Sequence, residues 1–375
     1  MTETTTISPA SFVYESLPTR VIFGHGTRTK VKEEADRLGI LRPLIVHSPG
    51  HAAIAEAIAE DIGRQSVTTF GGAKMHTPVE VTEAALVLAA GKCADGIIAV
   101  GGGSTTGLSK AIALRTDLPQ IVLPTTYAGS EMTPILGETR DGAKTTLRSL
   151  KVLPETVIYD VDLTLDLPRA LTGVSGMNAM AHAVEALYAR DANPIISALA
   201  IESIRALAQS LPAIHADPRD RAARKNALYG AWLAGVCLGS VGMALHHKLC
   251  HTLGGTFNLP HAESHAIVLP HALAYNAPAI PQVMARLSEA LNHPDPALAL
   301  HEMSIAAGTP TALSEIGMPE DGVDKAIELA LANPYWNPRP LERDALRDLI
   351  GRAFRGMPPS TSAMTNMVPL TKDER

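Results

Sequence analysis

Short β-rich runs alternate with helical segments up to about residue 160 of this 375-residue chain. Apolar residues dominate most of these runs, as expected of strands that are buried on both faces of a sheet. The segments between them, such as 51–63 and 79–92, have the length and composition of helices. Strands that are joined by helices form a parallel sheet with helices on both faces. The runs are PLIVH (43–47), VTTF (67–70), GIIAV (96–100), QIVL (120–123) and VIYD (157–160).

The pattern changes after LTLDLP (163–168), where Ala- and Leu-rich segments with a three-to-four-residue period begin. Such a period is typical of amphipathic helices, and Pro and Gly separate the segments. We therefore predict two domains, an α/β domain at 1–163 and an all-α domain at 164–375, with an active site between them. The helical segments are 193–214, 218–239, 241–256, 280–292, 297–308, 320–332 and 341–354.

The overall charge and the cysteines disfavour several classes of function. The formal net charge of −6 argues against nucleic acid or an anionic membrane surface as a partner. The N-terminal residues do not form a secretory signal, and no run of about 18 apolar residues predicts a transmembrane helix. The three cysteines, Cys93, Cys237 and Cys250, are odd in number and lack CxxC spacing. This pattern predicts a reduced, cytoplasmic protein with neither disulfides nor a thiolate zinc site.

A glycine-rich turn joins a predicted strand to a predicted helix in IIAVGGGSTTGLSKAIAL (97–114). Gly101, Gly102 and Gly103 let the backbone turn tightly and approach a ligand closely. Ser104 and Thr105 are expected to cap the helix, whose N-terminal amides attract a pyrophosphate. The GxGxxG fingerprint of dinucleotide-binding folds is absent, and a plain turn with a helix cap is the alternative. Three consecutive glycines exceed what a turn requires, so we favour a Rossmann-like, dinucleotide-binding sheet.

The loop VLPTTYAGSEMTP (122–134) follows the next strand and is dense in hydroxyl groups. Because the carboxyl ends of parallel strands line the cofactor crevice, we expect this loop to lie beside the glycine turn. The hydroxyls of Thr125, Thr126, Ser130 and Thr133 can then bond the ribose or the carboxamide of a cofactor.

Two polar residues at helical spacing mark the segment GVSGMNAMAHAVEAL (173–187). Asn178 and His182 lie four residues apart, so both side chains leave a helix from one face. A carboxylate and an imidazole at this spacing would form half of a divalent-metal site. Here the first position carries a neutral amide instead.

A second segment, MALHHKLCHTLGGTFNLPHAESHA (243–266), holds five histidines within twenty residues. On a helix, His247 and His251 share one face, and His246 shares a neighbouring face with Cys250. A GGTFNLP turn then precedes two further histidines, His261 and His265. The clustering indicates a site, and both divalent-metal binding and the handling of protons or anions remain open as its purpose.

Together these motifs resemble the iron-containing alcohol dehydrogenase superfamily over nearly the whole chain, from VIFGHG (21–26) onward. The resemblance implies a dehydroquinate synthase-like architecture, in which a dinucleotide-binding domain is paired with a helical metal domain. In the family, an Asp and a His four residues apart and two histidines fourteen apart hold the metal. The matching positions are Asn178, His182, His247 and His261, so the single carboxylate ligand is missing. An amide is only a weak, neutral donor for Fe²⁺ or Zn²⁺.

Two further departures indicate a branch of the superfamily that works without metal. Gly107 stands where the alcohol dehydrogenases carry the Asp of GGGSxxD, and TTYAGSE is one residue shorter than their usual TTAGTGSE loop. With GMNAMAH and ALHHKLCH, these features resemble the maleylacetate reductases. The resemblance implies NADH- or NADPH-dependent reduction of the carbon–carbon double bond of 2-maleylacetate, a small dianion, to 3-oxoadipate in bacterial degradation of aromatic compounds. It implies no metal, and we expect a cytoplasmic homodimer.

The resemblance also implies roles for individual residues. His247 and His251 are expected to stabilise an enolate and to deliver a proton, with His182, His261 and Asn178 in the same site. The cofactor contacts by position are Gly102, Gly103, Ser104, Thr125, Thr126, Thr133, Ser48 and Lys144, of which Lys144 is expected to reach a ribose hydroxyl. Ser48 stands near the Asp that often selects NAD over NADP in the family, so use of both cofactors is expected.

Three other functions stay open. The nearest is a metal-dependent alcohol dehydrogenase that accepts Asn as a ligand, and metal analysis with an aldehyde assay would identify it. A lyase of the dehydroquinate synthase type also needs a metal centre. A non-catalytic NAD(H)-binding sensor belongs to a different class and would bind the cofactor without turnover.

Overall fold

Six parallel strands form the centre of the N-terminal half of the protein. The structure is a computed structural model, and it describes residues 11–63, 67–140, 142–332 and 335–360. The strand order is β1-β8-β5-β4-β2-β3. The chain passes from β2 outward to β3 and returns to β4 on the other side of β2, so a topological switch point lies between β2 and β4. The strands are β1 (Arg20–Gly24), β2 (Pro43–His47), β3 (Thr68–Phe70), β4 (Gly96–Gly101), β5 (Gln120–Pro124) and β8 (Thr156–Asp160).

Helices cover both faces of this sheet, because successive side chains of each strand point to opposite faces. Ile45, Ile98 and Ile121 are fully buried on the face that packs against α1 (Val31–Leu38) and α2 (Ala52–Ile62). Leu44, Ile97 and Val122 are fully buried on the opposite face, under α3 (Val79–Gly91) and α4 (Gly103–Thr116). The predicted α/β class with a parallel, Rossmann-like sheet is confirmed.

The C-terminal half is helical, and α5 lies at its centre. Every residue of α5 from Thr172 to Ala186 is buried, and the helix packs against α6, α7 and α9. A second core joins α8, α9, α12 and α13. The helices are α5 (Arg169–Ala186), α6 (Pro194–Ala216), α7 (Arg221–Ser240), α8 (Leu245–Phe257), α9 (His261–Asn276), α10 (Pro281–Leu291), α11 (Pro296–Ala306), α12 (Gly322–Ala332) and α13 (Arg343–Arg355).

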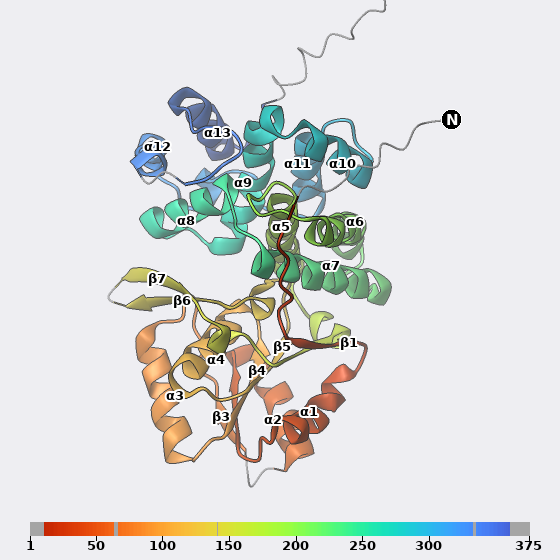
Figure 1. Cartoon of the computed structure of the whole chain (residues 1–375), viewed down its shortest axis with the longest axis vertical. Helices are drawn as coiled ribbons and strands as arrows, with labels where there is room; N and C mark the ends of the chain where they lie inside the picture. The colour runs from red at the N-terminus through yellow and green to blue at the C-terminus, as the bar shows by residue number, and fades with distance from the viewer. Residues whose placement is uncertain (1–10, 64–66, 141, 333–334, 361–375) are drawn as a thin grey trace, which may run out of the picture.

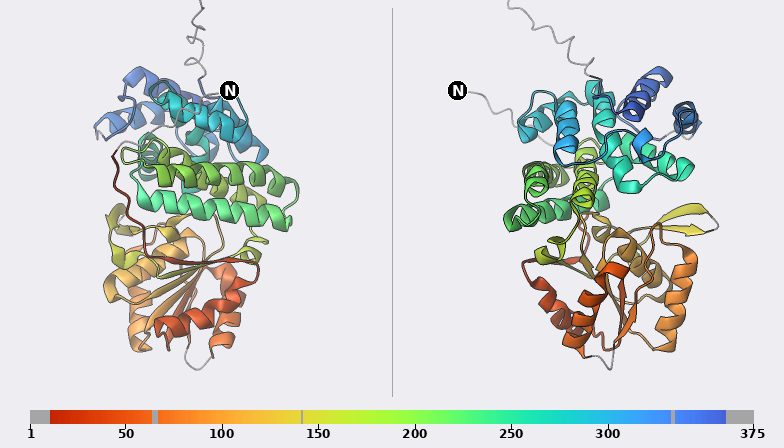
Figure 2. Two further views of the ribbon diagram at one scale, coloured as in Figure 1. Left: turned by 45° about the vertical axis from the view of Figure 1, so that its right-hand side comes forward. Right: turned by 180° about the vertical axis from the view of Figure 1, so that it is seen from behind.

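The two halves stack along the long axis of the molecule, with the sheet below and the helices above (Figures 1 and 2). A two-stranded antiparallel hairpin, β6 (Ile135–Arg140) and β7 (Ala143–Arg148), projects at the level where they meet. β8 ends at Asp160 and α5 begins at Arg169. The domain boundary predicted between 163 and 164 falls between these elements and stays a prediction.

Several local predictions were wrong. β3 was expected to be a buried strand, but it is the edge strand and is only partly buried, since only β2 pairs with it. The glycines of GGTFNLP were expected in a turn, but α8 continues through them to Phe257. Asn258 ends that helix in a left-handed conformation, with φ of 53°, and Pro260 precedes α9. The hairpin β6–β7 and helix α9 were not among the predicted elements.

Among the described residues, no single helix is both long and apolar enough to cross a membrane. Only α7 and α8 taken as a pair reach that length and apolarity, and this pair is bent by 92°.

Candidate active site

The glycine turn lies at the carboxyl end of β4, beside the switch point. A Cβ atom on Gly101, which has φ of 154°, would lie 2.4 Å from Thr105 Oγ1, and one on Gly102 would lie 2.8 Å from Thr126 Cγ2. Larger residues therefore do not fit at these two positions. The predicted capping by Ser104 and Thr105 was wrong, since α4 begins at Gly103 and its N-cap residue, Gly102, has no side chain to accept a hydrogen bond. The first backbone amides of α4 are left without a side-chain cap.

Buried hydroxyls without partners surround this turn. Among the described residues, Thr105 Oγ1, Thr125 Oγ1 and Ser130 Oγ have no hydrogen-bond partner. Ser48 follows β2 on the other side of the switch point, and its hydroxyl lies 2.5 Å from His51 Nδ1. Buried polar atoms normally have partners, so unpartnered hydroxyls beside an uncapped helix N-terminus fit the ribose and phosphate groups of a dinucleotide.

The predicted cofactor loop contains one residue that is held from within the protein. Lys110, which was not predicted as a site residue, is buried on α4 and extends its ammonium group into the loop after β5. Its Nζ donates to the carbonyl oxygens of Ser130 (2.5 Å), Thr133 (2.6 Å) and Ile135 (2.9 Å) and to Thr133 Oγ1 (3.0 Å). Burial lowers the pKa of Lys110 to about 7. Four acceptors around one nitrogen favour the ammonium form, because a neutral amine has only two donors. Thr133 therefore helps to order the loop, and its hydroxyl is already hydrogen-bonded to Lys110.

Two other predicted positions have different surroundings. At Gly107, a Cβ atom would lie 2.3 Å from Thr77 Oγ1, so the Asp that other family members carry there would not fit beside Thr77. Thr77 itself has φ of 48°, which is unusual for a β-branched residue. Lys144 lies on β7, and its side chain is outside the part of the chain that the structure describes.

The loop after β5 also contacts the helical half. Its Tyr127 backbone amide donates to Ser175 Oγ on α5 at 2.8 Å. Gly129 has φ of 78°, and a Cβ there would lie 3.1 Å from the Cα of Gly235 on α7. Ala128, between them, turns its carbonyl oxygen toward α5, 3.2 Å from His182 Nε2. The loop that lines the cofactor region thus touches the histidine cluster directly.

Four buried side chains form a hydrogen-bonded row, which we call the histidine row. Asn178 Nδ2 lies 3.2 Å from His182 Nε2, and His182 Nδ1 lies 2.8 Å from His247 Nε2. His247 Nδ1 lies 2.6 Å from Glu185 Oε2. Asn178, His182 and Glu185 occupy positions i, i+4 and i+7 of α5, which lie on one face of the helix. Glu185 was not predicted as a site residue, although its spacing places it on the same face as Asn178 and His182.

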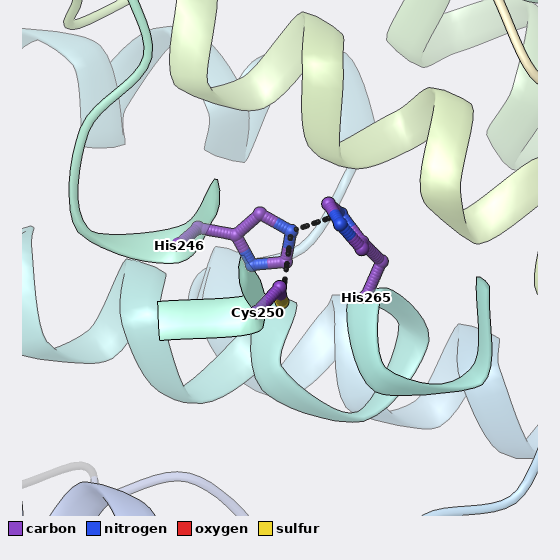
Figure 3. Close-up of side chains that lie close together, drawn as sticks. All are labelled: His246, Cys250 and His265. Carbon is purple, nitrogen blue, oxygen red and sulfur yellow. Dashed lines mark hydrogen bonds between the residues drawn. The ribbon is translucent and has the colours of Figure 1, made fainter. Parts of the chain in front are cut away.

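A second group of side chains, the buried trio of His246, Cys250 and His265, lies beside the row. His246 Nε2 and His265 Nδ1 are 2.9 Å apart, and Cys250 Sγ lies 3.9 Å from His246 Nε2 (Figure 3). The ring centroid of His265 lies 4.9 Å from that of His247 and 4.3 Å from that of His261. The trio thereby links the row to His261.

Exposure divides the histidines into two sets. His182 and His247 are buried, at 3% and 5% exposure, whereas His251 and His261 are exposed. The His251 ring centroid lies 6.5 Å from that of His247 and 6.4 Å from that of His261. Of the histidines predicted for the site, His251 and His261 are therefore the ones that a ligand can reach directly.

Burial also determines the charge of the buried rings. It lowers the pKa of His182 well below the usual value, and the neighbouring His247 ring adds to this effect. Burial likewise lowers the pKa of His246 and of His265, and it raises the pKa of the Cys250 thiol. At neutral pH, His182, His246 and His265 are neutral imidazoles and Cys250 is a thiol.

The ligand positions of the superfamily do not fit a metal ion as they lie here. Nitrogen ligands of one tetrahedral ion are roughly 3.3 Å apart, given metal–nitrogen bonds of about 2.0–2.1 Å. His182 Nδ1 and His247 Nε2 are closer than this, at 2.8 Å, and share a hydrogen bond. Asn178 offers only a neutral amide, which is a weak ligand, and its Nδ2 lies 3.2 Å from His182 Nε2. Among the described residues, the group whose potential ligand atoms all lie within 4.8 Å of one another is the buried trio, which also contains a hydrogen-bonded nitrogen pair.

Comparisons with known proteins agree with this architecture. Residues 18–161 match the iron-containing alcohol dehydrogenase family, and residues 172–354 match the C-terminal region of the Fe-containing alcohol dehydrogenase family. The chain is 54% identical to a maleylacetate reductase of Sphingobium indicum over 94% of this chain and 99% of the relative. It is 50% identical to that of Burkholderia cepacia over 93% of this chain and 99% of the relative. The crystal structure of maleylacetate reductase from Agrobacterium tumefaciens is similar, with a TM-score of 0.90 and 52% identity over 93% of this chain and 100% of that one. The chain therefore belongs to the iron-containing alcohol dehydrogenase family.

Proposed function

We propose that this protein is a maleylacetate reductase, which reduces the carbon–carbon double bond of 2-maleylacetate to 3-oxoadipate with NADH or NADPH. The observation that carries the proposal is the neutral amide of Asn178, whose Nδ2 lies 3.2 Å from His182 Nε2, at the position where metal-dependent family members hold a carboxylate ligand. The identity of about half of all residues with maleylacetate reductases over nearly the full length supports the same function.

The proposed substrate suits a site without a Lewis acid. An aldehyde substrate needs a metal to polarise its carbonyl and to hold the alkoxide that forms. Maleylacetate is an enone between two carboxylates, so a hydride added to the alkene carbon β to the ketone produces an enolate. Hydrogen-bond donors can stabilise that enolate, and a general acid can protonate its carbon. The hydride is the contribution of the nicotinamide cofactor.

Residues of the two halves have separate tasks in this reaction. We assign cofactor binding to the glycine turn and to the unpartnered hydroxyls beside it, with Lys110 holding the loop in place. Proton delivery is assigned to His251, because it is exposed and lies next to His247. His247 and His182 hold the interior of the site through the histidine row. His261 is the second exposed imidazole and is assigned to the substrate carboxylates.

We also propose which cofactors the protein uses, how it assembles and where it is located. Ser48 carries no charge to repel a 2′-phosphate, which supports use of both NADH and NADPH. We propose a homodimer, supported by the exposed apolar side chains of Phe12, Val13 and Tyr14 just before the edge strand β1. A cytoplasmic location is the proposed compartment, because the reaction needs NAD(P)H. The proposed domain boundary lies between residues 163 and 164.

The test is oxidation of NADH or NADPH with freshly generated maleylacetate, before and after exhaustive chelation. We expect equal turnover in both samples. Loss of activity on chelation, restored stoichiometrically by iron or zinc, would contradict the metal-free site. Reduction of an aldehyde that also requires added metal would identify an alcohol dehydrogenase, and tight cofactor binding without any turnover would identify a sensor.

A further inference from the structure

Glu185 is a buried carboxylate whose contacts are all hydrogen-bond donors. It is fully buried, at 0% exposure. Its Oε2 accepts from His247 Nδ1 (2.6 Å) and from the backbone amides of Ala244 (3.1 Å) and His247 (3.4 Å). Its Oε1 accepts from the backbone amide of His246 (2.9 Å). These amides belong to the N-terminus of α8, so Glu185 on α5 caps that helix. The same carboxylate also holds the side chain of His247 in the first turn of α8.

The bond to Glu185 sets which nitrogen of His247 carries a proton. Because the oxygens of a carboxylate only accept, His247 has a proton on Nδ1. His247 Nε2 and His182 Nδ1, 2.8 Å apart, share a second hydrogen bond. The other nitrogen of His182, Nε2, lies 3.2 Å from the Ala128 carbonyl oxygen.

Asn178 stands at the other end of the row. Its Nδ2 lies 3.2 Å from His182 Nε2 and 3.4 Å from the Ala128 carbonyl oxygen. Asn178 Oδ1 is buried and has no hydrogen-bond partner among the described residues.

We propose that Glu185 is a positioning residue of the active site, which keeps a proton on Nδ1 of His247 and holds the Nε2 of that ring toward His182. This inference rests on the proposed function for its kinetic consequences and on the geometry alone for its structural ones. It requires a hydrogen-bond acceptor at position 185.

The first test is a nuclear magnetic resonance experiment on the free enzyme with ¹⁵N-labelled histidine. We expect one histidine in the Nδ1–H form with a proton signal shifted far downfield, as the 2.6 Å hydrogen bond to Glu185 requires. Glu185→Gln should remove this signal, while Glu34→Gln, at a buried carboxylate of the α/β half bound to Arg20 and Arg37, should keep it. A wild-type spectrum without such a proton would overturn the inference, whether or not the enzyme reduces maleylacetate.

The second test compares Glu185→Gln with Glu185→Asp in steady-state kinetics. Gln has the size of Glu, but its NH₂ group would oppose at least one of the donors; Asp is shorter and still only accepts. Loss of such a supporting carboxylate typically costs about 10–100-fold in activity, and we expect Gln to lose turnover to this extent with an unchanged Michaelis constant for NADH. Asp should retain more turnover than Gln. A purely structural role for Glu185 gives the opposite order, because Gln preserves packing, and this order would overturn the inference.

Discussion

The two parts of the active site are built in opposite ways. Around the glycine turn, backbone amides of α4 lack a cap, and the hydroxyls of Thr105 and Thr125 have no partner among the described residues. In the histidine row, each ring nitrogen of His182 and His247 already has a partner within the protein. The region around the glycine turn is complementary to a ligand that brings its own polar groups. In the histidine row, the hydrogen-bonding groups of the rings are paired within the protein before any ligand binds.

This difference predicts different effects of substitution. Changes near the glycine turn remove contacts to the cofactor, so they should act on cofactor affinity. Changes among the histidines disturb groups that hold or move a proton, so they should act on turnover.

Replacement of His251, the exposed histidine beside His247, should reduce turnover the most. General acids typically contribute 10²–10⁴-fold, and we expect His251→Ala to lose turnover by about this factor. His247→Ala should also reduce turnover, because it interrupts the histidine row. The measurement is kcat for NADH oxidation with maleylacetate, with the partly exposed His293→Ala as control. Turnover within a few-fold of wild type in both variants would exclude histidine acid catalysis and would point to another acid.

Introduction of a charge near the adenosine ribose should change cofactor choice. Ser48→Asp places a carboxylate after β2, where it can accept from ribose hydroxyls but repels a 2′-phosphate. A repulsion of roughly 2 kcal/mol would shift the ratio of kcat/KM values toward NADH by about 30-fold. Ser48→Asn is the uncharged control. An unaltered NADPH-to-NADH ratio would mean that the ribose binds elsewhere.

Obstruction of the glycine turn should weaken cofactor binding without affecting the histidines. A Cβ on Gly103 would meet no described atom closer than 3.5 Å, so Gly103→Val can fold while it blocks the approach of a ligand. We expect the Michaelis constant for NADH to rise roughly tenfold, equivalent to about 1.4 kcal/mol, with little change for maleylacetate. Gly91→Val, at the end of α3 where nothing lies within 4 Å of the added Cβ, is the control. Equal cofactor titrations for the two variants would show that the crevice is misplaced.

Replacement of His271, which lies outside both the glycine turn and the histidine row, should affect only the stability of the protein. His271 lines a cavity of about 470 Å³ away from the histidine row, and neither of its ring nitrogens has a partner among the described residues. Burial first, then the nearby His301 and Arg352, lowers the pKa of His271 from 6.5 to about 3. Between these values the unfolded chain binds a proton that the native protein excludes, so the free energy of unfolding falls as the pH drops below 6.5.

Removal of this imidazole should therefore reduce acid sensitivity. At pH 5 the difference amounts to about 2 kcal/mol, from about 1.4 kcal/mol per pH unit. We expect His271→Leu to unfold at a urea concentration equal to or above that of wild type at pH 7.5, and to lose less stability at pH 5. A variant with the full acid sensitivity of wild type and unchanged activity would show that His271 is protonated in the folded protein.

The parallel sheet was predictable because its central strands are almost continuous apolar runs. The segments 43–47, 96–100 and 120–123 contain little except buried positions, and β2, β4 and β5 coincide with them within one residue. The edge strand β1 has only the short apolar run VIF and is only partly buried. In the hairpin, β6 mixes polar with apolar residues. Helix α9 contains Pro270 in its interior, and an interior proline argues against a helix in a sequence.

The site was predictable only where residue types are unusual. Histidines at helical spacing and three successive glycines stand out, and the structure brings His182, His247 and His265 into contact. Glu185 and Lys110 did not stand out, because one charged residue in a helix usually faces solvent. The contribution of Ala128 comes from a backbone carbonyl, which no side-chain pattern reveals.

The carbonyl oxygen of Ala128 has a consequence for the ancestry of the site. Ala128 belongs to TTYAGSE, the loop that is one residue shorter than is usual in the family, and its oxygen lies 3.4 Å from the amide nitrogen of Asn178. The shortened loop and the exchanged ligand, which are 50 positions apart in the chain, therefore meet at a single contact and form a linked pair of changes. A substitution at either of the two positions would therefore change the surroundings of the other.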